Sequence, residues 1–409
     1  MYARIITGEE MRILLITDYL PYLPISGDTI RVYNLIKRIS LQHEIYLLAL
    51  FETPNVQDSI LHLENFCHQI EVVNHKWPNP LTCLPEMLLY YLRGWPMELR
   101  LLHSSKMANL IFDLTSTDSF DVVQIEHSRL ALYREYINPQ SHCATVLTFH
   151  NVALVQSERI SRIEKSLVSR LRSWIFARQL YRWEAIYAGK FDRCFAVSER
   201  EREILLKRNP HLKVDLIPNG TDSKRYKPLD INRGPAALLF IGSMSYAPCI
   251  DGVVYFCKEI LPHVQNIFQN INVWIVGADP SPDVIRLADQ HVHVTGYVED
   301  VLPYYQQATV SIVPLRAGGG TRLKILEAMA LGRPVVSTTI GCEGLDVLDG
   351  QHLLVADEPK KFAEQIIRLL GDSVLYRYIA TEARKLVEER YDWDVITEQS
   401  LDAYKAATN

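Results

Sequence analysis

The sequence predicts an α/β protein with two domains, each built on a mostly parallel sheet covered by helices. The length of 409 residues favours two or three domains over one. The composition, 48% hydrophobic and 22% charged, is that of an ordinary globular protein. Short apolar runs alternate with helical patterns through both halves of the chain, which indicates parallel strands joined by crossover helices.

The first half opens with the run Arg12–Thr17, whose unbroken apolar character is typical of a strand buried on both faces. A loop with proline and glycine follows, and then residues 28–40 place apolar side chains at helical spacing. More strands are expected at Ile45–Leu50, Val122–Ile125, Thr145–Thr148 and Cys194–Val197.

The second half repeats this alternation. Strands are expected at Ala237–Ile241, Val273–Val276, Val292–Thr295, Val310–Val313, Pro334–Ser337 and Leu353–Val355. Helices are expected at Asp251–Ile267, Val301–Ala308, Thr321–Leu331, Lys361–Leu370 and Ser373–Arg390. The turn-rich segment Ile217–Gly220 marks a boundary, so we expect domains at residues 1–218 and 219–390 and a terminal segment at 391–409.

Composition and motifs disfavour several classes of protein. The net charge of −5 gives no electrostatic argument for nucleic-acid binding. The seven cysteines are scattered and form no C-x-x-C pair, which argues for a reducing compartment and against a disulfide framework or a structural zinc site. No clustered aspartate pair suits Mg²⁺. Dehydrogenase, P-loop and zincin motifs are also missing from the sequence.

Targeting signals are equally sparse. No apolar run reaches the roughly 18 residues of a membrane span, and the N-terminus does not match a signal peptide. Residues 1–10 read as a short extension before the first strand. We therefore expect a cytoplasmic protein.

The most informative stretch runs from Pro314 to Val336. Three glycines, at 318–320, separate an apolar run from a helical pattern. Glycine allows a sharp turn and close approach of a ligand, and the helix start offers unpaired N–H groups and partial positive charge. Arg322 and Lys324 add two full charges. This combination predicts an anion site, with phosphate as the usual anion, although a plain strand-to-helix turn would also use such glycines.

Glu327 follows Lys324 by three residues, so both project from neighbouring parts of one helix face. A carboxylate does not bind phosphate, but it accepts hydrogen bonds from a diol such as that of ribose. A diphosphate next to a ribose describes a nucleotide-sugar.

With these residues the stretch resembles the donor site of retaining glycosyltransferases of the family 4 (group 1) type, closest to a bacterial exopolysaccharide branch. The resemblance implies the GT-B fold, in which two Rossmann-like doubly wound domains face each other across a cleft. The first domain would bind the acceptor and the second the nucleotide-sugar donor. The segment 391–409 would form a helix that crosses back to the first domain, anchored by Trp393.

The resemblance also implies the reaction and its partners. A sugar would move from a nucleoside diphosphate to the hydroxyl of a saccharide or lipid-linked acceptor, with retention and without a metal or another cofactor. The transfer would take place in the cytoplasm, and with a lipid-linked acceptor it would take place at the inner face of the membrane. The catalytic residues implied are His150, Arg322, Lys324 and Glu327. The donor-binding residues implied are Gly27, Gly242, Ser243, Met244, Tyr297, Val298, Gly318, Gly319, Gly320 and Thr321.

Several of these positions have their own sequence argument. His150 follows a predicted strand, where an open α/β sheet binds its ligands, whereas His127 is better explained as a packing residue. The loop at Gly27 is equally well explained as a β-to-α turn. Asn219–Asp222 resembles a hinge segment of the family, and we assign it no catalytic role.

The sequence departs from the family pattern at two places. Ser243 and Met244 stand where many members carry Arg and Lys after the glycine. Gly319 stands where the earlier glutamate of the E-x7-E pair is usual, and this puts the identity of the transferred sugar in doubt. A GT-B nucleotide-sugar epimerase and a non-catalytic sugar-nucleotide sensor remain as alternatives.

The segment 159–182 interleaves arginines with leucine, isoleucine and tryptophan. A basic amphipathic helix of this kind can lie on an anionic membrane. A solvated charged face above a core stripe is the more frequent explanation of such a pattern.

Overall fold

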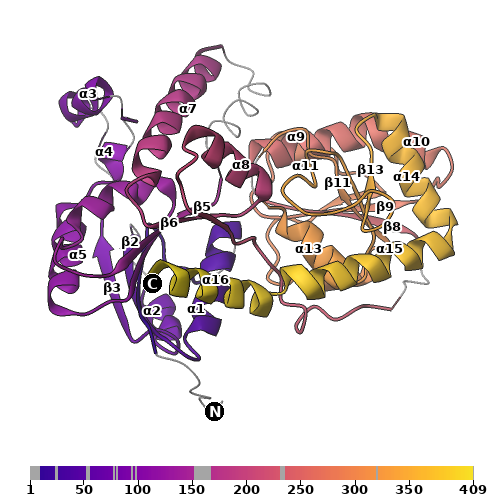
Figure 1. Ribbon diagram of the computed structural model, residues 1–409. Coiled ribbons are helices and arrows are strands. Elements are labelled where there is room, and N and C mark those ends of the chain that lie inside the picture. The colour runs from indigo at the N-terminus through magenta and orange to yellow at the C-terminus, as the bar shows by residue number, and fades with distance from the viewer. Residues whose placement is uncertain are drawn as a thin grey trace. The chain divides into compact units, whose positions relative to one another are not determined.

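The computed structural model describes residues 10–23, 26–51, 56–76, 79, 82–93, 95–96, 99–151, 167–230, 235–318 and 321–408 (Figure 1). Within these ranges the chain divides into two compact units. The first holds residues 10–151, 172–218 and 396–408, and the second holds residues 167–171 and 219–395. Each unit contains one parallel sheet, which confirms the predicted α/β class.

The first unit is built on a seven-stranded sheet in the order β3-β2-β1-β4-β5-β6-β7, with every pairing parallel. Its strands are β1 (Arg12–Thr17), β2 (Glu44–Phe51), β3 (Gln69–Asn74), β4 (Val122–Glu126), β5 (Ala144–Phe149), β6 (Arg193–Ala196) and β7 (Val214–Leu216). Its helices are α1 (Gly27–Ile39), α2 (Gln57–Leu63), α3 (Leu84–Leu92), α4 (Leu99–Leu102), α5 (Ser105–Thr117), the 3-10 segment Ser128–Tyr136, α7 (Leu167–Ala188) and α8 (Glu199–Arg208).

The second unit is built on a six-stranded parallel sheet in the order β10-β9-β8-β11-β12-β13. Its strands are β8 (Ala237–Ile241), β9 (Asn272–Val276), β10 (Val292–Val294), β11 (Val310–Val313), β12 (Val335–Ser337) and β13 (Leu354–Val355). Its helices are α9 (Ala247–Tyr255), α10 (Leu261–Gln265), α11 (Pro282–Ile285), α12 (Leu302–Gln307), α13 (Leu323–Ala330), α14 (Pro359–Gly371) and α15 (Ser373–Leu386). π-helical turns at Phe256–Ile260 and Val387–Tyr391 lengthen α9 and α15.

The last helix, α16 (Trp393–Thr408), begins in the second unit, and from Ile396 onward its residues belong to the first. Inside the first unit the Tyr404 hydroxyl donates to the Gln124 side chain on β4. Trp393 is 1% exposed and its N–H donates to the Thr221 carbonyl, 3.2 Å away, within the second unit.

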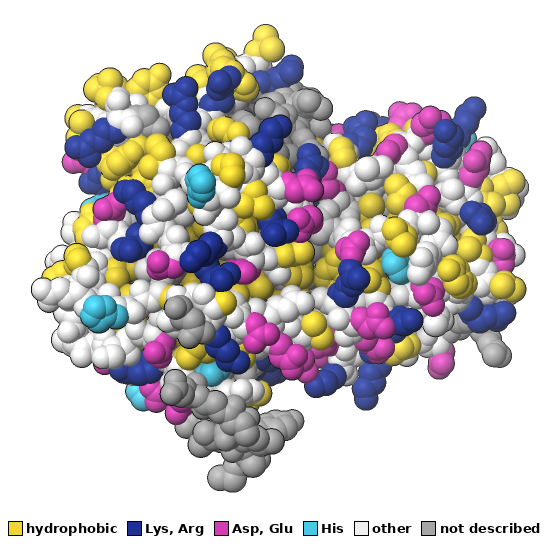
Figure 2. Space-filling model, viewed as in Figure 1, with side chains coloured by type: hydrophobic (Ala, Val, Ile, Leu, Met, Phe, Trp, Pro, Cys, Tyr) yellow, Lys and Arg dark blue, Asp and Glu magenta, His cyan; other side chains and the backbone are white. Residues whose placement is uncertain are grey.

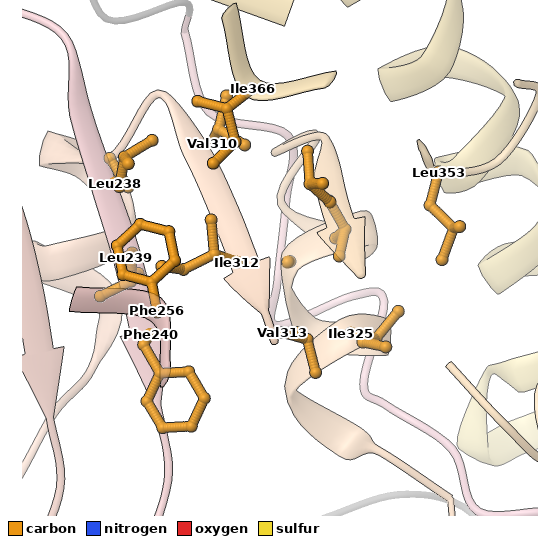
Figure 3. Packing of buried hydrophobic residues seen from close by; sticks show 14 of the residues in the cluster. Leu238, Leu239, Phe240, Phe256, Val310, Ile312, Val313, Ile325, Leu353 and Ile366 are labelled. Atoms are coloured by element: carbon orange, nitrogen blue, oxygen red, sulfur yellow. The ribbon is translucent and has the colours of Figure 1, made fainter. Parts of the chain in front are cut away.

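The core of the second unit shows why these residues form strands. Leu238, Phe240, Val310 and Ile312 are at most 1% exposed, and Ile325 of α13 packs into the same cluster (Figure 3). A strand covered on both faces by helices must be apolar throughout. The central strand β8 meets this condition, β11 meets it except at the buried Ser311, and both strands match their predicted bounds.

Three differences between the expected and observed elements are worth naming. β3 and β7 were not predicted, and they are the two edge strands of the first sheet. The helix expected at Asp251–Ile267 begins four residues earlier, with Pro248 in its first turn, where proline is tolerated. The helix expected at Thr321–Leu331 begins at Leu323, so Thr321 and Arg322 precede it.

Candidate functional site

The carboxyl ends of β10, β9, β8 and β11 bring the predicted donor segments of the second unit together. These four strands are neighbours in the sheet. The N–H of Gly242, after β8, donates to the carbonyl of Val276 at 3.0 Å, and the N–H of Gly277, after β9, donates to the carbonyl of Gly296 at 3.1 Å. The loops that follow β8, β9 and β10 therefore form one surface at this edge, where open α/β sheets bind ligands.

Gly242 lies next to the ammonium group of Lys324. A methyl group at position 242 would stand 2.6 Å from the Lys324 Nζ and 2.9 Å from the Cys249 Sγ. The ammonium lies 3.9 Å from that sulfur and 4.4 Å from the centre of the Phe240 ring. The missing side chain at 242 thus leaves room for the lysine head between β8 and α9.

Lys324 is only partly exposed. Burial lowers its pKa, and the positive charge of Arg322 lowers it further, while Glu327 acts in the opposite direction. A cation that has lost part of its hydration interacts more strongly with an arriving anion than a fully solvated one. The position therefore favours electrostatic binding of a phosphate.

Arg322 caps the start of α13 and folds against the glycine turn. Gly318 has φ +115°, a conformation that favours glycine, and a methyl group there would stand 2.7 Å from the Arg322 Nη2. Thr321 is partly exposed beside it. Gly319 and Gly320 lie outside the described residues, so their predicted contacts stay predictions.

Glu327 is positioned by a buried tyrosine. The Tyr305 hydroxyl donates to the Lys324 carbonyl at 3.2 Å and approaches the Glu327 Oε2 at 3.5 Å. Burial raises the pKa of Glu327, and the charges of Lys324 and Arg225 oppose that rise. The predicted pair Lys324 and Glu327 thus occupies one partly buried helix face, a cation and a hydrogen-bond acceptor side by side.

The other donor candidates differ in what they expose. Ser243 is exposed, and its hydroxyl contacts that of Ser245 at 2.9 Å. Met244 is fully buried, and its N–H donates to the Ala278 carbonyl. Tyr297 is 65% exposed, whereas Val298 packs partly against the core. The aromatic face of Tyr297 is therefore available to a ligand, and the Met244 side chain is not.

The first unit carries a separate polar cluster at the carboxyl ends of β1, β4 and β5. His150, one residue after β5, places its Nε2 2.6 Å from the Glu126 Oε2 at the end of β4. Both side chains are buried, at 7% and 1% exposure. The second Glu126 oxygen accepts from the Gln124 amide and, at 3.3 Å, from the Thr148 hydroxyl.

Burial and the neighbouring charges set the protonation of this pair. Burial would raise the pKa of Glu126, but the bond and charge of His150 outweigh it and hold the pKa at about 2. Burial and the neighbouring His127 lower the pKa of His150 to about 4. At neutral pH the carboxylate only accepts, so the Nε2 of a neutral His150 carries the proton, and its Nδ1 remains an acceptor.

His127 stacks on His150 with ring centroids 4.1 Å apart, and its Nε2 lies 3.5 Å from the Asp28 Oδ2. Asp28 accepts from the Thr29 N–H in the first turn of α1, beside Gly27. Burial would raise the pKa of Asp28, but the nearby His127 and the hydrogen bond from the Ser26 hydroxyl outweigh burial and lower that pKa. The loop at Gly27, His127 and His150 therefore meet in one cluster. Pro24 and Ile25 of that loop lie outside the described residues.

Sequence reasoning did not identify Glu126, Cys249 or Tyr305. A carboxylate at the end of a fully buried, mostly apolar strand was a signal for Glu126. Nothing in the sequence marks Cys249 as the neighbour of Lys324, 75 positions away. Among the described residues, no group of three or more His, Cys, Asp or Glu side chains could hold a metal ion, and no helix combines the length and apolar character of a membrane span.

Comparison with known proteins relates both halves of the chain to glycosyltransferases. Residues 25–225 match the family model of Glycosyltransferase Family 4, and residues 235–372 match that of Glycosyl transferases group 1. A phosphatidyl-myo-inositol mannosyltransferase of Mycobacterium leprae is 29% identical over 155 residues, 36% of this chain and 41% of that protein. The match thus spans less than half of that relative's length.

Two further comparisons extend over nearly the whole chain. The O-antigen chain mannosyltransferase B of Escherichia coli is 25% identical over 97% of this chain and 100% of its own length. The crystal structure of Anabaena HepE in complex with UDP-glucose superposes with a TM-score of 0.67 at 13% identity, covering 97% of this chain and 100% of that one. The sheets are the two Rossmann-like domains of the GT-B fold. The two family matches, one in each half of the chain, together with the shared fold support a glycosyltransferase with the GT-B fold.

Proposed function

We propose that this protein transfers a sugar from a nucleoside-diphosphate sugar to an acceptor hydroxyl, with retention of anomeric configuration. The observation that carries the proposal is the partly buried cation of Lys324, held beside Gly242 and followed by Glu327 on the same helix. The arrangement offers charge for a diphosphate and an acceptor for a ribose diol. HepE binds UDP-glucose on the same fold, which supports a nucleotide-sugar as the donor.

In the proposed reaction, the bond between the anomeric carbon and the diphosphate oxygen breaks, and its electron pair leaves with the diphosphate. Lys324, Arg322 and the N–H groups at the start of α13 stabilise that charge as it develops. The acceptor hydroxyl attacks on the departing side, and a phosphate oxygen takes its proton. Glu327 fixes the donor by its ribose, an orientation effect, and no metal or separate enzymic nucleophile is required.

His150 acts as a neutral contact for the sugar in this scheme. Because its Nε2–H is bonded to Glu126, the free Nδ1 is a hydrogen-bond acceptor for a sugar hydroxyl. The buried carboxylate of Glu126 fixes the orientation of the His150 ring, which supports a role for His150 in aligning the sugar. We do not propose a proton-donating role, since burial holds the pKa of His150 well below neutrality.

The acceptor is proposed to be a saccharide or lipid-linked saccharide in bacterial exopolysaccharide or surface-glycan assembly. Two relatives support this. One is named an O-antigen chain mannosyltransferase, and a Klebsiella pneumoniae protein of a cps region is 26% identical over 164 residues.

The test is incubation with UDP-, GDP-, ADP- and dTDP-sugars, with and without saccharide acceptors, while free nucleoside diphosphate is measured. Slow release without acceptor and fast release with it support transfer, and proton NMR of the product then shows the anomeric configuration. Isomerisation of the donor without release would instead indicate an epimerase. Donor binding without any turnover would indicate a sensor protein, and an inverted product would refute retention.

A further inference from the structure

Helix α3 is apolar on the side that faces solvent. Cys83, Met87 and Tyr90 point inward at the i, i+4 and i+7 spacing of a buried helical stripe. Leu84, Leu88 and Leu92 form a second stripe at i, i+4 and i+8, yet they are 55%, 52% and 73% exposed. A surface helix normally carries polar side chains there, so burial within the first unit does not account for these leucines.

Helix α7 repeats the pattern along its first half. Leu171, Trp174 and Ile175 are 60%, 44% and 40% exposed, and Leu167 and Val168 before them are each 78% exposed. In the second half of the helix, by contrast, Leu180, Trp183 and Tyr187 are buried in the core. The helix is thus anchored at one end and presents an apolar stripe to solvent at the other. Residues 159–166 of the segment singled out in the sequence lie outside the described residues.

Aromatic contacts tie the two helices together inside the first unit. Tyr90 of α3 meets Trp95 edge to face at 5.3 Å, and Trp95 meets Trp183 of α7 at 5.1 Å. The exposed stripe of α3 and the part of the α7 stripe from Trp174 onward therefore belong to one compact unit. Figure 2 shows hydrophobic side chains gathered where Figure 1 places α3 and α7, with Lys and Arg side chains among them. We call the exposed residues of α3, together with Arg93 and the exposed residues of α7 from Trp174 onward, the apolar–basic face.

The charge on this face is one-sided. Exposed arginines of the first unit stand at 93, 178 and 182. The guanidinium of Arg178 lies over the Trp174 ring at 5.0 Å, and that of Arg93 lies over the Trp95 ring at 5.5 Å. Of the described side chains on α3 and α7, only Glu86 and Glu184 are acidic. Glu86 is ion-paired with Arg100, and Glu184 is fully buried.

We infer that the apolar–basic face is a peripheral binding surface for an anionic lipid bilayer. Leucine, tryptophan and tyrosine side chains would enter the headgroup boundary, and the arginines would meet lipid phosphates. A protein partner covering this face would need an acidic side chain opposite each arginine. A bilayer with anionic headgroups presents negative charge over its whole surface and needs no such alignment. The inference does not depend on the proposed reaction, because none of these residues belongs to the donor site.

The test is flotation of the full chain with phosphatidylcholine vesicles and with vesicles containing about one third phosphatidylglycerol. We expect the wild type to float with the anionic vesicles and to be released as salt rises toward about 0.5 M. The double variant L88E/L92E should lower the bound fraction at least about tenfold. The double variant R178Q/R182Q should weaken binding to anionic vesicles and leave any binding to phosphatidylcholine unchanged.

Matched controls carry the same chemistry elsewhere. Leu61 of α2 and Leu348 of the second unit are 53% and 56% exposed, so L61E and L348E test for an effect of added charge alone. All variants should melt within a few degrees of the wild type and release nucleoside diphosphate from a soluble donor at the wild-type rate, which separates this inference from the proposed function.

Three results would overturn the inference. The wild type could fail to float with anionic vesicles. The controls could reduce flotation as much as L88E/L92E. Light scattering could also show a wild-type dimer that L88E/L92E converts to a monomer in a chain that binds no vesicles, which would make the face a contact between two copies.

Discussion

At the scale of single residues, two glycines at the donor edge have different neighbours: side chains surround Gly242, and backbone lies against Gly277. A methyl group at Gly242 would meet the flexible end of Lys324, whereas a methyl group at Gly277 would stand 1.7 Å from the Gly242 carbonyl oxygen, and Gly277 has φ +155°. A side-chain end can move away, but backbone cannot. The two positions therefore separate binding from folding.

We predict that Gly242→Ala displaces the lysine ammonium and weakens donor binding about tenfold or more. Because the added methyl group also meets the Cys249 sulfur at 2.9 Å, this variant should lower the unfolding free energy, but by less than Gly277→Ala does. Gly277→Ala should instead lower the unfolding free energy by about 2 kcal/mol or more. Urea denaturation and donor titration of both variants check this. A Gly242→Ala protein that binds donor normally would show that the ammonium does not contribute from its present position.

The Glu126–His150 pair predicts a pH dependence of stability. Its two groups have folded pKa values below their ordinary values of 4.5 and 6.5, so between these values the unfolded chain binds more protons. Their contribution is complete above pH 6.5 and is lost as pH falls, first for His150 down to about 4 and then for Glu126.

We expect the free energy of unfolding to decrease by roughly 1–3 kcal/mol between pH 7 and pH 4 because of His150. A His150→Gln variant should lose that part of the pH dependence. His43→Gln does not test the pair, because the His43 ring accepts from the Met11 N–H at 3.1 Å. Denaturant titrations of both proteins at four pH values measure how the unfolding free energy changes with pH. Equal slopes for wild type and His150→Gln would contradict the assignment.

At the scale of elements, most of the fold could be predicted because its central strands are buried on both faces. Arg12–Thr17 and Val310–Val313 matched to the residue. The strands missed, β3 and β7, lie at the edges of their sheet, and in β3 only Val73 is buried. An edge strand half open to solvent has no continuous apolar run, so a one-dimensional pattern does not reveal it.

The site could be predicted only where its residues are close in the chain. The glycine turn, Arg322, Lys324 and Glu327 fall within ten positions and were found from spacing. Contacts between elements were not, since Cys249 reaches Lys324 across α9 and α13 and Glu126 reaches His150 across β4 and β5. These contacts follow from strand order, which no local pattern encodes.

Helix α13, which carries the donor residues, is held at its carboxyl end by Arg384. The Nη1 of Arg384 donates to the Ala330 carbonyl at 2.7 Å, and its Nη2 donates to the Ser223 carbonyl at 2.9 Å. A cation at a helix C-terminus satisfies the last carbonyls and complements the helix dipole.

Arg384→Ala should therefore lower the unfolding free energy by about 2 kcal/mol, the typical loss for charged hydrogen bonds to buried carbonyls. Arg390→Ala is the matched control. The Arg390 side chain is 60% exposed and pairs with Asp346, and a surface ion pair contributes at most about 1 kcal/mol to stability. Chemical denaturation at neutral pH measures both. If Arg384→Ala and Arg390→Ala lower the unfolding free energy equally, α13 does not depend on the Arg384 contacts.

At the scale of the whole molecule, the chain divides its polar groups between two Rossmann-like units. The second unit gathers cations and glycines at one sheet edge, while the first gathers two histidines and two carboxylates at the corresponding edge of its own sheet. Each unit therefore carries a candidate site of its own, with charge for an anion in the second unit and hydrogen-bonding groups in the first.

The most direct test of this account is a calorimetric titration of the wild type, Lys324→Ala and Lys361→Ala with the nucleoside diphosphate of the accepted donor. Lys361 is the control, because its side chain is 63% exposed and lies on α14. We predict that Lys324→Ala weakens binding at least about tenfold, or about 1.4 kcal/mol, and that Lys361→Ala binds like the wild type. Equal affinity in all three proteins would show that the α13 cation does not hold the diphosphate.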